Sequence, residues 1–178
     1  MNTVPSMGKV PSKSAEEILT QASAIVSSWD WATETSRPNP KQLDVKVNSL
    51  QELIPMVVGL RVKRLGHLSA IVCMDLTGQA GAEAKELEVI YYFCPGDATI
   101  ALRVRIPRAQ AVLPSLCEVV PGAESFEREL REMFGIEITG LVTPDRLYLP
   151  EDWPEGVYPM RKDFDPKVDL AQAGKQDV

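Results

Sequence analysis

The densest group of chemically active side chains lies in the segment ESFERELREMFG, residues 124–135. Its charged members alternate in sign along the chain: Glu127, Arg128, Glu129, Arg131 and Glu132. Two carboxylates can serve as general acid and general base, so one interpretation is an enzyme that uses Glu129 with Asp163. A simpler interpretation places the i,i+4 pairs Glu127–Arg131 and Arg128–Glu132 on a solvated helix face, where each contributes about 0.2–0.5 kcal/mol.

Few residues could bind a metal ion or act as a catalytic nucleophile. His67 is the one histidine, and Cys73, Cys94 and Cys117 form no CxxC pair. Zinc and iron–sulfur sites draw on clustered Cys and His ligands, so we expect no metal and no cofactor in this chain. The thiols are expected to be buried in a reducing compartment. No G-x-G-x-x-G or P-loop pattern is present.

Charge and hydropathy argue against two further classes. The net charge is −6, whereas nucleic-acid binders carry a basic patch or stripe, so we expect no nucleic-acid partner. No apolar run approaches the roughly 18–20 residues of a membrane-spanning helix. The N-terminus has lysines without a following apolar block, which argues against a secretory signal.

Periodicity predicts the elements that must position these side chains. Ser14 and Glu17 form a capping box for a helix that ends near Ser28. Ser49 and Glu52 offer a second capping box, and Pro55 should kink the helix that follows it or make that helix begin later. Alternation predicts strands over residues 43–47, 87–93 and 100–106. The mostly apolar residues 68–76 suit a central strand.

Two features follow from these strands. Turn residues 95–97 join the last two strands into a hairpin. Pairing their apolar faces inward puts Glu86 or Glu88 opposite Arg103 or Arg105 on the outer face.

The charged segment itself is predicted to be a helix. Its apolar residues lie on one stripe, at Phe126, Leu130, Met133 and Phe134. Ser125 is the expected N-cap and Gly135 the expected C-terminal cap. The preceding residues, 108–121, are expected to be helical as well.

Residues 141–178 carry a different pattern, which we call the arm. Prolines at 144, 150, 154 and 159 exclude a long helix or a central strand. The arm nevertheless carries large apolar groups: Leu147, Tyr148, Leu149, Trp153, Tyr158, Met160 and Phe164. These groups need a surface, either the chain's own core or a partner, because interfaces are rich in Trp, Tyr, Met and Arg. Residues 167–178 are polar and are expected to be mobile.

The amino-acid sequence of two segments resembles that of a known family. The stretch ERELREMFGIEITG, followed by PDRLYLPEDWPEGVYPMRKDF, is similar to the 30-kilodalton subunit family of respiratory complex I. That family includes the matching subunit of membrane-bound group 4 [NiFe] hydrogenases. The similarity is strongest over residues 113–164.

The resemblance implies a fold and a role. The fold is α+β, a two-layer domain over residues 1–140 with a mixed, largely antiparallel sheet, followed by an extended arm over residues 141–178. The role is that of a non-catalytic structural subunit in the peripheral arm of a redox complex. Its partners would be the large catalytic subunit, small iron–sulfur subunits and, indirectly, membrane subunits. The nickel–iron site and the iron–sulfur clusters would belong to those partners, and the chain would sit on the cytoplasmic face of the membrane through them.

The resemblance also gives the charged clusters a role. Tyr148 and Trp153 would anchor the partner, while other charged residues would pair across the interface or pin the arm to the helix. The full predicted partner-binding set is Glu127, Arg128, Glu129, Asp145, Arg146, Tyr148, Trp153, Arg161, Lys162 and Asp163.

Two alternatives remain beside this interpretation. Family members of complex I have a histidine after Gly140, where this chain reads LVTPDRL. This departure favours the hydrogenase branch over an NADH/quinone oxidoreductase subunit, which stays as the alternative. An assembly factor that leaves the mature complex is the other.

Overall fold

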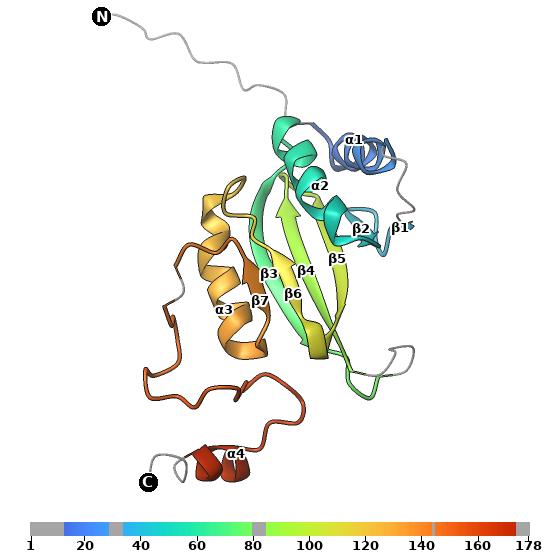
Figure 1. The fold of residues 1–178 in the computed structure, drawn as a ribbon. Coiled ribbons are helices and arrows are strands. Elements are labelled where there is room, and N and C mark those ends of the chain that lie inside the picture. The colour runs from blue at the N-terminus through green and yellow to red at the C-terminus, as the bar shows by residue number, and fades with distance from the viewer. Residues whose placement is uncertain (1–12, 29–33, 80–84, 144, 174–178) are drawn as a thin grey trace, which may run out of the picture.

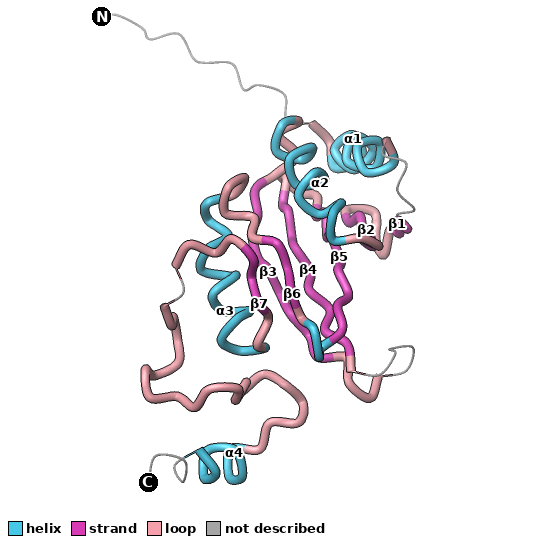
Figure 2. The backbone as a smooth tube through the Cα atoms, viewed as in Figure 1, coloured by secondary structure: helices cyan, strands magenta, loops and turns pink. Residues whose placement is uncertain are grey.

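The computed structural model describes residues 13–28, 34–79, 85–143 and 145–173. Helices and strands make up the chain until residue 139, after which the arm runs without regular structure to a last short helix (Figures 1 and 2). The elements are α1 (Ala15–Ser27), β1 (Glu34–Ser36), β2 (Gln42–Val47), α2 (Leu50–Val62), β3 (His67–Asp75), β4 (Glu86–Cys94), β5 (Thr99–Pro107), β6 (Val112–Pro114), α3 (Glu124–Phe134), β7 (Glu137–Thr139) and α4 (Pro166–Ala173).

A five-stranded sheet forms one layer, in the order β1-β2-β5-β4-β3. β2 runs parallel to β5, and the other neighbours are antiparallel. Helices α1, α2 and α3 pack on one face, around a core that includes Leu43, Tyr91 and Leu102. A second sheet pairs β6 with β7 in parallel. The predicted α+β class with a mixed, largely antiparallel sheet is confirmed.

Several local predictions are confirmed. Ser14 and Glu17 form the capping box of α1, and the strands of the β4–β5 hairpin lie where alternation placed them. Ser49 caps α2 by accepting a hydrogen bond from the Gln51 amide. Glu52, however, does not complete a capping box at Ser49: it is 5% exposed, and its Oε2 has no hydrogen-bond partner among the described residues. α2 continues through Pro55.

Other local predictions were wrong. β3 is an edge strand of the sheet rather than a central one. Part of its apolar composition is exposed, at Val72 and Met74 on the outer face. Residues 108–121 contain a 3-10 turn and strand β6 rather than a helix, since pairing with β7 overrides local preference. α3 begins at Glu124, and Ser125 does not cap it. Part of the tail expected to be mobile forms α4, while residues 174–178 lie outside the described residues.

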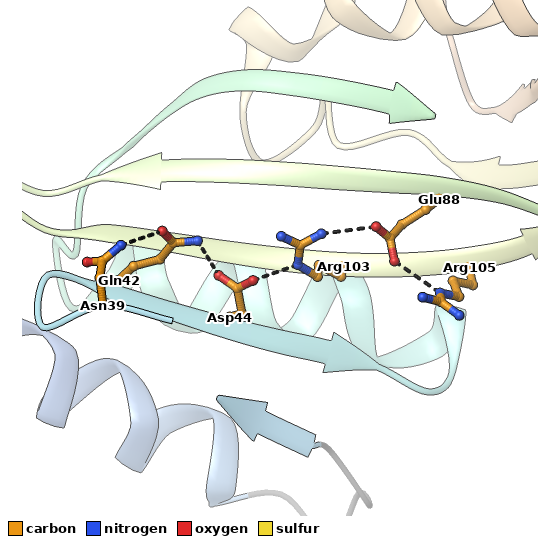
Figure 3. Close-up of polar contacts among 6 residues, drawn as sticks. All are labelled: Asn39, Gln42, Asp44, Glu88, Arg103 and Arg105. Atoms are coloured by element: carbon orange, nitrogen blue, oxygen red, sulfur yellow. Dashed lines mark hydrogen bonds and ion pairs between the residues drawn. The ribbon is translucent and has the colours of Figure 1, made fainter. Parts of the chain in front are cut away.

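The outer face of the sheet carries a ladder of alternating charges (Figure 3). Arg103 donates through Nε to Asp44 at 2.7 Å and through Nη1 to Glu88 at 3.0 Å, and Arg105 donates to the other oxygen of Glu88 at 3.0 Å. Gln42 continues the chain to Asp44 at 2.6 Å. The side chains of Asp44 and Glu88 are only 9% and 8% exposed. The predicted pairing across the hairpin is confirmed, and it neutralises carboxylates that are nearly buried.

Candidate partner-docking site

Helix α3 is the element on which the arm rests (Figure 1). Leu130 and Phe134 are buried in the core, so the helix is fixed to the domain along the predicted apolar stripe. The helix ends at Gly135, whose φ of 67° lies in the left-handed region that favours glycine. The packed helix therefore holds the charged side chains between these apolar residues in fixed positions.

Glu127 faces inward rather than to solvent, and the interpretation of a solvated Glu127–Arg131 pair was wrong. It is 2% exposed. One carboxylate oxygen accepts from the Leu116 amide at 2.6 Å, and the other accepts from the Ser115 hydroxyl at 2.7 Å and the Cys117 thiol at 3.2 Å. This carboxylate thus stabilises the turn after β6, because each bond to a charged acceptor is stronger than a neutral one.

Arg128 and Glu132, one helical turn apart, hold the first part of the arm. Arg128 donates to the backbone carbonyls of Asp145 and Arg146, at 3.1 and 2.8 Å. Glu132 accepts hydrogen bonds from three successive amides, those of residues 147–149. The two side chains therefore satisfy backbone groups that a segment without regular structure cannot pair internally.

The end of α3 holds the second part of the arm. Arg161 donates to the Phe134 carbonyl at 2.7 Å, and its guanidinium lies 4.2 Å from the centre of the Tyr158 ring. The Met160 amide donates to the Met133 carbonyl at 3.1 Å. These contacts supply donors to carbonyls that the helix end leaves free.

A third fastening joins the arm to the edge of the main sheet. The carboxylate of Asp75 accepts from the Lys162 amide at 3.0 Å and pairs with Arg108 at 3.3 Å. Arg108 also binds Asp163, and Lys162 Nζ reaches the Thr77 carbonyl at 2.8 Å. Burial raises the pKa of Asp75, but hydrogen bonds from Thr77 and Lys162 and the charge of Arg108 outweigh it, so the pKa lies below its usual value. The hydrogen bond from Arg108 likewise lowers the pKa of Asp163.

Contacts within the arm fix the shape of its middle. Arg146 donates to the Trp153 carbonyl at 2.6 Å, and Trp153 Nε1 donates to the Val157 carbonyl at 2.9 Å. The rings of Trp153 and Phe164 lie 6.2 Å apart. The arm is therefore an ordered segment with its own internal contacts.

The fastened arm still presents apolar groups to solvent. Tyr148 is 62% exposed and Met160 is 58% exposed. Between α3 and the arm lies an open cavity of ≈380 Å³, whose wall includes Arg128, Glu132 and Trp153. The arm is thus neither wholly buried in its own domain nor detached from it. An ordered, partly apolar surface of this kind can serve as a contact for another protein.

The predicted partner-binding residues divide into three groups. Seven make contacts within the chain, either to the domain or within the arm: Glu127, Arg128, Arg146, Trp153, Arg161, Lys162 and Asp163. The Tyr148 ring is exposed, and only its amide is bonded to Glu132. The carboxylates of Glu129 and Asp145 make no hydrogen bond or ion pair among the described residues. A role for any of them in docking stays a prediction.

Several residues that organise this site were not predicted to be part of it. Glu132 could have been found, because it lies four positions after Arg128 on the same helix face. Asp75 and Arg108 lie 33 positions apart, and no local spacing relates them. Tyr158, which packs on Gly135, was noted only as an apolar residue.

The remaining chemical candidates lie apart from this site. His67 is exposed and hydrogen-bonds to Ser69. The three thiols are half-buried rather than fully buried, and burial raises the pKa of Cys73 to about 12. Within the described ranges, no group of three or more His, Cys, Asp or Glu side chains is arranged to hold a metal ion. No described helix is long and apolar enough to cross a membrane.

Comparison with known proteins supplies relatives of two kinds. Membrane-bound hydrogenase subunit beta of Pyrococcus furiosus is 37% identical over 75 residues, which cover 42% of this chain and 43% of that protein. Formate hydrogenlyase subunit 5 of Escherichia coli is 36% identical over 67% of this chain and 20% of its own length. A subunit of the NADH-quinone oxidoreductase of Roseobacter denitrificans is 30% identical over 83% of this chain and 69% of its own length. The chain thus spans less than half of the first two relatives.

Solved structures share the fold. A chain of the membrane-bound sulfane sulfur reductase, an archaeal respiratory membrane complex, superposes with a TM-score of 0.63 at 22% identity, over 92% of this chain and 91% of that chain. The trypsin-resistant fragment of Nqo5 gives a TM-score of 0.52 at 22% identity, over 74% of this chain and 98% of that chain.

The fold and the arm together define an α+β domain of the type found in subunits of respiratory redox complexes. Residues 43–169, most of the chain, match one family in particular. The chain belongs to the family described as the respiratory-chain NADH dehydrogenase, 30 Kd subunit.

Proposed function

We propose that this chain is a non-catalytic structural subunit of a membrane-bound [NiFe] hydrogenase-like redox complex, in which its arm docks on the large catalytic subunit. One observation carries the proposal. The arm backbone is fastened at both ends to α3 and to Asp75, yet Tyr148 and Met160 remain 62% and 58% exposed. A rigid segment that presents aromatic and thioether groups is pre-organised for binding, which lowers the entropy cost of association.

The relatives support the choice of complex. Two of them are named as components of hydrogenases, namely membrane-bound hydrogenase subunit beta and hydrogenase-4 component G, and a third is formate hydrogenlyase subunit 5. In this proposal the nickel–iron site and the iron–sulfur clusters belong to the large and small partner subunits. The chain itself supplies assembly contacts and reaches the membrane through those partners.

The equivalent subunit of an NADH/quinone oxidoreductase is the second candidate. The relative from Roseobacter denitrificans favours it, because the match spans 83% of this chain and 69% of that relative. The two candidates share the docking role of the arm and differ in the partner's chemistry. Nickel in the purified assembly would favour the hydrogenase, and an assembly with iron but no nickel would favour the quinone enzyme.

Co-purification tests the docking role. Tyr148→Asp combined with Met160→Asp places two charges on the exposed part of the arm without removing a side-chain fastening. We expect the tagged variant to lose most of the large subunit that the unmodified chain retains. Val72→Asp is the control, since Val72 is an exposed apolar residue (40%) on the outer face of the sheet and pairs with Ile90 rather than with a carboxylate. Full retention by the double variant would overturn the proposal.

A further inference from the structure

A second apolar surface lies between helices α1 and α2, at the opposite end of the molecule from the arm and α4 (Figure 1). It is an open groove of ≈470 Å³. Among the described residues, its wall is formed by apolar and small side chains and one lysine, without a carboxylate: Ile25, Ser28, Ile54, Pro55, Val58, Gly59, Val62 and Lys63.

The groove owes its shape to a close approach of the two helices. A Cβ on Gly59 would lie 2.8 Å from Ile25 Cγ2, so only glycine lets α1 and α2 meet at this point. On α2 the surface continues into Val58, which is 39% exposed, and Val62, which is 72% exposed. Exposed valines one turn apart on a helix form a stripe that a further helix can cover.

Cationic residues lie beside one end of the groove: Lys63 lines it, and Arg61 and Arg64 are close to Lys63 in sequence. Arg61, Lys63 and Arg64 follow one another at the C-terminal end of α2, and all three are exposed. In the part of the chain that the structure describes, none of their side chains has a hydrogen bond or an ion pair. The carbonyl end of a helix stabilises cations, which explains why they persist here without carboxylates. Three unmatched cations stand out in a chain whose net charge is −6.

We propose that this groove docks an amphipathic helix of a neighbouring subunit, one with an apolar face and acidic residues in its first turn. Apolar anchors spaced i, i+3 and i+4 would fill the space between Ile25 and Val58. An antiparallel orientation would bring the N-terminal turn of that helix beside Arg61, Lys63 and Arg64. Acidic residues are favoured in such a first turn and would complement the three cations.

The shape of the surface favours a helix over a lipid headgroup layer. The apolar residues line a concave groove, whereas a peripheral element inserts a protruding apolar face into a bilayer. The cations lie beside one end of the groove rather than around it, so they fit a partner with charge at one end. This inference rests on the proposed membership in a complex, but not on docking by the arm. With both surfaces occupied, the chain would contact the large subunit through the arm and a second subunit through the groove.

Photo-cross-linking in the assembled complex tests the inference. The photoreactive residue p-benzoylphenylalanine replaces exposed Val62 in one variant and exposed Tyr148 in another. We expect the residue at 62 to cross-link a peptide of another subunit whose sequence has helical apolar spacing and an Asp or Glu in its first turn. The combined substitutions Arg61→Glu and Lys63→Glu should lower that yield by about tenfold or more. Lys85→Glu is the control, because Lys85 is an exposed lysine outside the groove.

Each outcome separates the two proposals. A cross-link from position 148 but none from 62 overturns the groove inference and leaves the proposed function standing. Products from position 62 that are lipids, a second copy of this chain or another part of the same chain also overturn it, as does a yield unchanged by the charge reversal. Absence of cross-links from both positions, with no co-purified subunit, overturns both proposals.

Discussion

The ring of Tyr158 lies directly against Gly135, the residue that ends helix α3. Gly135 has a φ of 67° and leaves the space that the ring occupies. Arg161 covers the ring at 4.2 Å and donates to the Phe134 carbonyl. The helix end and the arm are therefore built as one unit, so a change at the cap should reach the docking surface.

Gly135→Ala tests this unit. The left-handed backbone costs an L-residue about 1–2 kcal/mol, and the new methyl group would collide with the Tyr158 ring, which adds about 1–3 kcal/mol of overpacking. Gly78→Ala is the control, since Gly78 has a φ of 76° with nothing within 4 Å. Urea unfolding should show a larger loss of stability for Gly135→Ala. Equal losses of stability in the two variants would show that the position of the Tyr158 ring does not require glycine at position 135.

Glu132→Gln should loosen the first part of the arm. The carboxylate accepts from the amides of residues 147–149, and hydrogen bonds to charged acceptors contribute about 1.5–3 kcal/mol when shielded from solvent. Hydrogen exchange of these amides should speed up by about tenfold or more, with little effect on the strands of the main sheet. Glu129→Gln, at a residue whose side chain has no hydrogen bond or ion pair among the described residues, should leave the exchange unchanged.

The fastening at Asp75 and Asp163 should be lost in acid. Both carboxylates have pKa values below the usual range, held down by hydrogen bonds and by Arg108. A group whose pKa is lowered by folding stabilises the native state above its unfolded pKa, and this contribution disappears as the pH falls through the folded pKa. The contribution should therefore be constant near neutrality and vanish well below pH ~4.

Carbon-13 titration of the carboxyl groups measures this effect. Arg108→Met should raise the pKa of Asp163, whose largest cause of lowering is the hydrogen bond from Arg108. Because the Asp163 side chain is 57% exposed, Asp163→Asn should cost less than about 1 kcal/mol near neutral pH and nothing in strong acid. A pKa for Asp163 that is unchanged in Arg108→Met would contradict the assignment.

Arg103→Met should destabilise the sheet. It removes the shared partner of Asp44 and Glu88, whose side chains are 9% and 8% exposed. Breaking a fully buried pair costs about 3–5 kcal/mol, and the 29% exposure of Arg103 reduces this to roughly 2–3 kcal/mol. Lys46→Met is the control on the same face, because Lys46 and Glu34 are 51% and 75% exposed. Similar losses of unfolding free energy for both variants would refute the role of the ladder.

Local patterns predicted much of the fold. The capping box at Ser14, the alternation in β4 and β5, and the cap at Gly135 are each set by residues close in sequence. Two cap predictions failed locally, at Ser125 and Glu52, but the errors in strand and helix assignment lie where pairing is non-local. β6 was expected to be helical because its partner β7 lies more than twenty residues downstream. β3 was placed in the centre because composition reports how apolar a strand is and not which strands flank it.

The candidate site combines features that the sequence indicated with contacts that it did not. The sequence pointed to the proline-broken arm and to the charged helix, and the structure shows that these two segments contact each other and that the Tyr148 ring is exposed. Their role in docking stays a prediction. The direction in which the charges point could not be inferred. Glu127 turns inward to the turn after β6, and Arg128 binds carbonyls of the arm. A helical spacing says which side chains share a face, but not which segment comes to lie on it.

By itself, the sequence determined the type of most main elements and the family, and its prolines excluded a long helix or a central strand from the arm. These depend on local backbone preference and on the periodicity of apolar residues. The tertiary structure decided the strand order, the charge ladder from Asp44 to Arg105, and the fastening of the arm through Asp75, Arg108 and Glu132. The physical reason is that charges and free backbone groups take whichever partners the folded chain brings within hydrogen-bond distance, and that proximity arises from the packing of distant segments.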